Sequence, residues 1–156
     1  MAVARRFPLL LLAYGALGTA GCGGESELSK QELIAKGDKL CAQTRGEQPQ
    51  APTGGGIPFP ALVAYLNRVE QVSKKALAKF RKLKPPSSER KRFDAFLAAA
   101  ERRLASIQLA RDGALARNTK EVTAAINEER TRLGPEYRRI ATEFGFKVCG
   151  SGGVRS

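Results

Sequence analysis

Residues 28–44 read LSKQELIAKGDKLCAQT, and this stretch predicts a capped helix with a cysteine on its inner face. The hydroxyl of Ser29 can accept a hydrogen bond from the backbone N–H of Glu32, and the Glu32 carboxylate can accept one from the N–H of Ser29. Apolar and small side chains then recur at helical spacing as far as Cys41. We therefore expect a helix near residues 30–44, with Cys41 facing the core.

Three longer helices are expected after this first one, because apolar residues recur at steps of four and three along most of the remaining chain. Gly134-Pro135 predicts a kink in the last helix, and Gly145 predicts its left-handed end. The expected seam of the first long helix consists of Leu62, Leu66, Val69, Ser73, Ala76, Phe80 and Leu83. The three helices are expected near residues 60–83, 88–112 and 119–144.

Residues 45–58 are expected to form a flexible linker, since they contain several prolines and glycines and no periodic apolar positions. The three long helices have short connections and should therefore alternate in direction. A disulfide between Cys41 and Cys149, just past the last helix, would then place the first helix parallel to the second. The predicted fold is all-α and four-helix bundle-like, with three long antiparallel helices plus a shorter N-terminal helix pinned by a disulfide.

Residues 1–21 have the three parts of an export signal peptide. Arg5 and Arg6 precede an apolar stretch at residues 7–17, and small residues follow up to Cys22. The apolar stretch is shorter than the ~20 residues that a membrane-spanning helix needs. We therefore expect the segment to be removed on export.

The cleavage region, Thr19-Ala20-Gly21-Cys22, resembles a bacterial lipobox, in which small residues precede a cysteine that receives a diacylglyceryl group. Thr19 departs from the pattern, which prefers an aliphatic residue there. This interpretation predicts an extracytoplasmic protein that is anchored to the cell membrane by lipid on Cys22. The alternative is ordinary cleavage after Ala20, which would release a secreted protein.

The cysteine count supports the anchored interpretation. An exported chain with three cysteines leaves one over after pairing, and lipidation of Cys22 leaves Cys41 and Cys149 as an even pair in an oxidising compartment. The alternative is two unrelated buried thiols. The expected segments are a signal peptide at 1–21, a tether at 22–28, a helical domain at 29–150 and a disordered tail at 151–156.

Four short motifs together resemble a known group of proteins. They are GCGG at residues 21–24, SKQELIAKGDKLCAQT at 29–44, LKPP at 83–86 and EFGFKVCG at 143–150. In this combination the chain resembles the small uncharacterised lipoproteins of high-GC actinobacteria. The resemblance implies a place in the cell envelope. It carries over no functional residue, because that group has no assigned activity.

The composition excludes several classes of chemistry. The chain has no histidine, and its only methionine is the initiator, so the usual ligands of zinc and haem sites are missing. Glu128 and Glu129 are adjacent on a helix and point about 100° apart, so they form no carboxylate pair. Asp38 is the most isolated acid, and we expect it on a helix surface or beside an arginine. We predict no catalytic residue, metal or cofactor, and no enzymatic activity.

The formal charge of +12 indicates an anionic partner, and loss of Arg5 and Arg6 with the signal would leave +10. The expected topology points the basic turn between the second and third helices away from the membrane, which favours an anionic wall polymer or an acidic protein. Few aromatic side chains accompany the cations, so nucleic acid is not expected. The alternative is a solvated helix surface without a ligand. The cations are Lys74, Lys75, Lys79, Arg81, Lys82, Lys84, Arg90, Lys91 and Arg92.

These features predict a lipid-anchored extracytoplasmic protein with an interaction or envelope-associated role. The sequence has the caps and the apolar core of a stable bundle but no set of chemical groups for a reaction. The alternative function is a carrier of a small apolar ligand, held in a slot between the helices.

Overall fold

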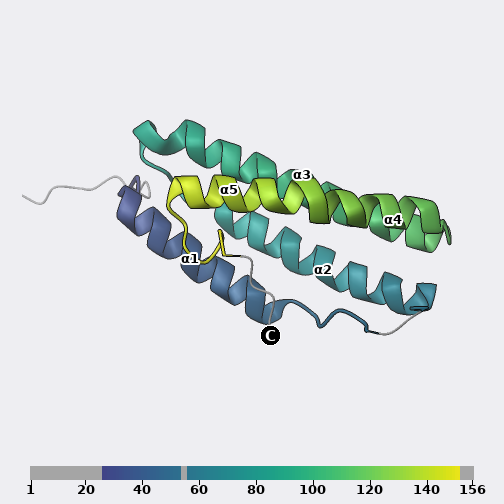
Figure 1. The fold of residues 1–156 in the computed structure, drawn as a ribbon. Coiled ribbons are helices and arrows are strands. Elements are labelled where there is room, and N and C mark those ends of the chain that lie inside the picture. The colour runs from purple at the N-terminus through teal and green to yellow at the C-terminus, as the bar shows by residue number, and fades with distance from the viewer. Residues whose placement is uncertain (1–25, 54–55, 152–156) are drawn as a thin grey trace, which may run out of the picture.

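The computed structural model describes residues 26–53 and 56–151, and within them the fold is all-helical (Figure 1). Cys22, the predicted signal peptide and most of the predicted tether and tail lie outside the described residues. No helix in the described part is long and apolar enough to cross a membrane. The helices are α1 (Lys30–Glu47), α2 (Phe59–Phe80), α3 (Arg90–Leu115), α4 (Thr119–Glu128) and α5 (Gly134–Phe144). A 3-10 turn (Ser87–Glu89) precedes α3, and a π-helical turn (Glu129–Leu133) joins α4 to α5.

The predicted caps are confirmed. The N–H of Ser29 donates to Glu32 Oε2 at 2.8 Å, and the N–H of Glu32 donates to Ser29 Oγ at 3.2 Å. Asn118 caps α4 by accepting the N–H of Glu121 at 3.2 Å. Gly145 ends α5 at a φ of 114°, a left-handed conformation that glycine adopts without steric cost. Local sequence therefore predicts these three helix limits. The expected ends at residues 44, 83 and 112 were wrong by three residues each, since α1 ends at Glu47, α2 at Phe80 and α3 at Leu115.

The expected kink at Gly134 and Pro135 takes the form of a π-helical turn just before them. Pro135 has no N–H to donate, and its ring would crowd the carbonyl four residues earlier in a regular helix. The wider π turn avoids this conflict, and the N–H of Gly134 donates to the carbonyl of Glu129. A Cβ on Gly134 would lie 2.8 Å from that carbonyl oxygen, so glycine is required there. The rod from α4 to α5 consequently continues past the proline.

The helix α1 runs antiparallel to α2, so the predicted parallel arrangement is wrong (Figure 1). The N–H of Leu28, just before α1, donates to the carbonyl of Lys84, just after α2, at 2.9 Å. At the other end of α1, Glu47 pairs with Lys75 of α2 at 2.9 Å. The prediction failed because it assumed that the chain stops at the end of α5, whereas residues 145–151 turn back along α1.

The core has two parts, one at each end of the bundle. The disulfide-end cluster is packed by α1, α2, α3 and α5, whereas the α4-end cluster is packed by α2, α3 and α4. The α4-end cluster consists of Leu66, Ala110, Ala114, Val122 and Ala125. The disulfide-end cluster consists of Leu33, Phe80, Phe93, Phe96, Ala141, Phe144, Phe146 and Cys149.

Phe96 is at the centre of the disulfide-end cluster. Its ring centroid lies 5.2 Å from that of Phe80, 4.9 Å from that of Phe146 and 5.2 Å from that of Tyr137. Gly37 of α1 lets the Phe146 ring pack directly against the helix, because a Cβ at that position would overlap the ring. The close approach of α1 to the rest of the bundle thus depends on one glycine.

Candidate functional site

The predicted disulfide is present, and it joins Cys41 in α1 to Cys149 beyond α5. The two Cα atoms are 5.3 Å apart and 108 residues separate them in the sequence. Cys149 is buried in the disulfide-end cluster. The bond therefore attaches the middle of the first helix to the returning C-terminal segment.

Asp38 holds the same segment through hydrogen bonds. Its carboxylate accepts the backbone N–H groups of Lys147 at 3.0 Å, Val148 at 2.7 Å and Cys149 at 3.3 Å. Arg45, two turns further along α1, donates to the carbonyl of Val148 at 2.8 Å. Asp38, which was expected on a helix surface or beside an arginine, thus holds the C-terminal segment against α1. We call the three hydrogen bonds to its carboxylate the Asp38 clamp. Sequence reasoning missed this role because Asp38 and its partners are at least 109 positions apart, and no local pattern in the sequence indicates a contact over that range.

The predicted basic turn lies beside the start of the helical domain. Arg90 forms an ion pair with Glu27 at 3.0 Å, and the N–H of Ser87 donates to the same carboxylate at 3.3 Å. Together with the bond from Leu28 to Lys84, these contacts place the turn at the end of the bundle where α1 begins. The expectation that the turn lies at the opposite end from the start of the first helix is therefore wrong.

Five of the nine predicted cations are held in ion pairs within the chain. Three of the five pairs join separate parts of the fold, and the other two join residues three or four positions apart. This favours the solvated-surface alternative for these five. The pairs are Lys74–Glu70, Lys75–Glu47, Arg81–Glu101, Arg90–Glu27 and Arg92–Glu89.

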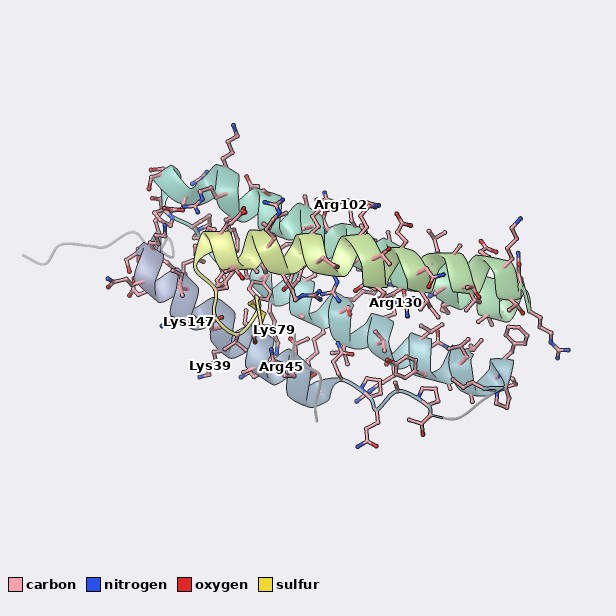
Figure 2. The ribbon with its side chains drawn as sticks, in the orientation of Figure 1. Lys39, Arg45, Lys79, Arg102, Arg130 and Lys147 are labelled. Carbon is pink, nitrogen blue, oxygen red and sulfur yellow. A yellow bond between two sulfur atoms is a disulfide. The ribbon has the colours of Figure 1, made fainter. Side chains whose placement is uncertain are left out.

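Two other predicted cations, Lys79 in the last turn of α2 and Lys82 just after that helix, line a surface groove that α1 completes. Lys36 and Lys39 of α1 line it from the other side, and its volume is about 300 Å³. Figure 2 shows Lys39 and Lys79 on the two neighbouring helices. Uncharged side chains also line the groove, namely Leu40, Gln43 and Leu83. Sequence reasoning missed the two α1 lysines, because their meeting with α2 depends on the antiparallel arrangement. We call these four lysines and the two leucines the lysine groove.

Glu70 is a buried carboxylate that the sequence did not reveal, and only 4% of it is exposed. Gln108 donates to it at 3.0 Å, Lys74 pairs with it at 2.5 Å, and Arg111 of α3 donates to its other oxygen. Burial raises the pKa of Glu70, but the hydrogen bonds from Lys74 and Gln108 and the charge of Arg111 outweigh burial. The net pKa lies below the ordinary value. The carboxylate is thus ionised and occupied by donors, which gives it a structural role.

Tyr137 lies beside the disulfide, and its pKa is shifted from the ordinary value. Burial raises its pKa to about 12, although the positive charge of Arg103 opposes the shift. The guanidinium of Arg103 lies 4.8 Å from the centroid of the Tyr137 ring, and the hydroxyl lies 3.8 Å from Cys41 Sγ. The phenol is consequently neutral at physiological pH and packs as part of the core.

The described residues contain no group of three or more acidic or cysteine side chains that could hold a metal ion. Comparisons with protein-family models, with curated proteins and with solved structures found no match. The lysine groove is a surface feature whose side chains offer both positive charge and apolar surface to a ligand.

Proposed function

We propose that this chain is a lipid-anchored extracytoplasmic protein that binds an anionic partner in the cell envelope and catalyses no reaction. The observation that carries the proposal is the hydrogen bond from the N–H of Leu28 to the carbonyl of Lys84. It joins the first residues of the helical domain to the basic turn. An anchor at Cys22 therefore holds this turn near the membrane.

The distance from the anchor to the domain is short. Leu28 lies six positions after Cys22, and a fully extended chain spans at most about 3.5 Å per position, or about 21 Å in total. The α4 end of the bundle is further away by the length of α3, whose 26 residues span about 39 Å. The anchor thus gives the bundle one end near the membrane and one end away from it.

The proposal that the chain catalyses no reaction is supported by the two carboxylates Glu70 and Asp38, both of which are bound by donors within the chain. Glu70 is occupied by Gln108, Lys74 and Arg111, and Asp38 is occupied by three backbone amides. The alternative function, a carrier of an apolar ligand, gains no support from the disulfide end, where packed aromatic rings fill the space between the helices.

The anchor is tested by expressing the full chain in a lipoprotein-processing bacterium and measuring the intact mass of the detergent-extracted product. The expected mass corresponds to loss of residues 1–21 and addition of a diacylglyceryl group at Cys22. Cys22→Ser is the matched control, and it should remove the lipid mass and the association with membranes. A soluble wild-type product that begins at Gly21 would refute the anchor.

A further inference from the structure

The lysine groove brings together four cations, three from helices α1 and α2 and one from the turn that follows α2. Lys36 and Lys39 are one turn apart on α1, whereas Lys79 is in the last turn of α2 and Lys82 lies in the turn that follows it. Because α1 and α2 are antiparallel neighbours, the two pairs lie on opposite sides of one groove. Leu40 and Leu83 line the same groove and also pack against the disulfide-end cluster. The groove therefore combines an apolar base with a cationic rim.

The acids nearest to this rim are already occupied. Glu32 of α1 accepts hydrogen bonds from the N–H and hydroxyl of Ser29, and Glu47 pairs with Lys75 at 2.9 Å. Among the described residues, the ion pairs within 4.0 Å include none from the four rim lysines. Five of the nine basic-turn cations are paired within the chain, whereas Lys79 and Lys82, which belong to both sets, form none of the ion pairs found among the described residues. Their charges are therefore available to a ligand.

We propose that the lysine groove binds the anionic phosphate headgroup of a phospholipid, so that the α1–α2 face lies against the membrane surface. This inference rests on the proposed function and names the chemistry of its partner. Charge complementarity requires an anion at the rim, and the leucines that line the groove accommodate the first acyl carbons of a phospholipid whose phosphate contacts the lysines. An anionic wall polymer without acyl chains has no comparable apolar part to place there.

The position of the groove agrees with a membrane partner. Lys36 and Lys39 lie eight and eleven residues after Leu28, which corresponds to about 12 and 17 Å along the bundle. A tether that reaches up to about 21 Å allows the bundle to lean and bring this side into the headgroup layer. Each lysine held near an anionic surface strengthens binding about fivefold.

The test uses the oxidised chain from residue 22 onward, with Cys22→Ser so that no lipid is attached. Every cap, core contact and disulfide described above lies within residues 27–151, so this chain retains them. Its binding to vesicles of phosphatidylglycerol and phosphatidylcholine is measured by co-sedimentation. We expect binding to the vesicles that contain phosphatidylglycerol, weakening with added salt, and none to pure phosphatidylcholine.

Two double variants locate the contact. Lys79→Gln with Lys82→Gln removes two groove charges and should weaken vesicle binding roughly 20-fold. Lys120→Gln with Arg130→Gln is the matched control, because it removes the same charge from exposed positions in α4 and the π turn, away from the groove (Figure 2). The control should change binding less than about twofold, since screening makes distant charges weak.

Three results would overturn the inference: equal weakening by both variants, equal binding to both kinds of vesicle, or tighter binding to soluble polyglutamate than to vesicles of the same charge. The last would indicate an acidic protein segment as the occupant. Circular dichroism of both variants confirms that the bundle is intact, since all four substituted side chains lie on the surface or its border. The vesicle assay needs no lipid on Cys22, so it can fail independently of the mass measurement.

Discussion

The two ends of the bundle are built by different means. The disulfide-end cluster brings together residues from α1 to beyond α5, through packed aromatic rings and a covalent bond across 108 residues. The α4-end cluster uses one valine, one leucine and three alanines, and α3 and α4 there are joined by a short turn. Ser106 of α3 adds a buried hydrogen bond to the carbonyl of Ala125 at 3.1 Å.

The two ends are therefore stabilised by contacts of different range along the sequence. Small side chains let α3 and α4 approach closely. Because a short turn joins the two helices, little conformational entropy of the chain is lost when they pack together. At the disulfide end, residues more than 100 positions apart come together, and closing that loop costs more conformational entropy. The large buried rings, the hydrogen bonds of Asp38 and the disulfide offset this cost. The end that carries the lysine groove is thus the end that depends most on long-range contacts.

Phe96→Ala should have the largest effect, because it removes a ring that is 1% exposed and contacts Phe80, Phe146 and Tyr137. We expect the free energy of unfolding to fall by about 3–5 kcal/mol. Val122→Ala is the matched change at the α4 end and should cost about 2 kcal/mol. Urea denaturation of the oxidised proteins measures both, and an equal cost would remove the distinction between the two ends.

Reduction of the disulfide should lower the free energy of unfolding by about 2–4 kcal/mol. The local effect is sharper than the global one, because the bond holds only α1 and residues 145–151 to the bundle. Hydrogen exchange should therefore quicken in those two segments while the amides of the α3–α4 contact keep their protection. Uniform loss of protection along the whole chain would show instead that the two ends unfold as one unit.

Glu70→Gln tests the polar connection between α2 and α3 at the middle of the bundle. It should cost about 1.5–3 kcal/mol at neutral pH, because Lys74 and Arg111 lose a charged acceptor. Since the folded-state pKa of Glu70 lies below its ordinary value, its stabilisation is present above that ordinary value and is lost as the pH falls through the folded-state pKa.

The measurement is the free energy of unfolding of both proteins between pH 7 and pH 3. The free energy of unfolding of the wild-type chain should exceed that of Glu70→Gln at neutral pH, and this difference should disappear in the acidic part of the range. An advantage that stays constant down to pH 3 would contradict the assigned direction of the pKa shift.

Ser29→Ala should have the smallest effect, about 1 kcal/mol, through loss of the α1 cap. Asn118→Ala, which removes the cap of α4, is the matched change at the other end. Thermal unfolding of the oxidised proteins measures both. We expect hydrogen exchange to quicken only in the first turn of the uncapped helix, and exchange that spreads along all of α1 would mean that the disulfide and the Asp38 clamp contribute little to holding it.

Sequence reasoning predicted the helices well where the signals are local. The capping box at Ser29 and the glycine stop at Gly145 are both confirmed. It was wrong on the seam of α2, where Glu70 is buried, although the step of three from Leu66 had selected Val69. A buried carboxylate is stable only with partners, and those partners belong to another helix.

The candidate site was predicted only in part. Lys79 and Lys82 were among the expected cations, whereas Lys36 and Lys39 were not. Helical spacing shows which lysines lie outside on one helix, but it does not show which neighbouring helix they meet. The orientation of the basic turn was wrong for the same reason.

The amino-acid sequence alone predicts the capped start of α1, the glycine stop of α5, the all-α class and the pairing of Cys41 with Cys149, because caps, periodicity and cysteine arithmetic act within short stretches or depend on counting alone. Only the tertiary structure decided the direction of α1, the clamp at Asp38 and the assembly of the lysine groove. Each of these depends on the return of residues 145–151 along α1. That return is stabilised by contacts across more than 100 residues, which no local pattern encodes.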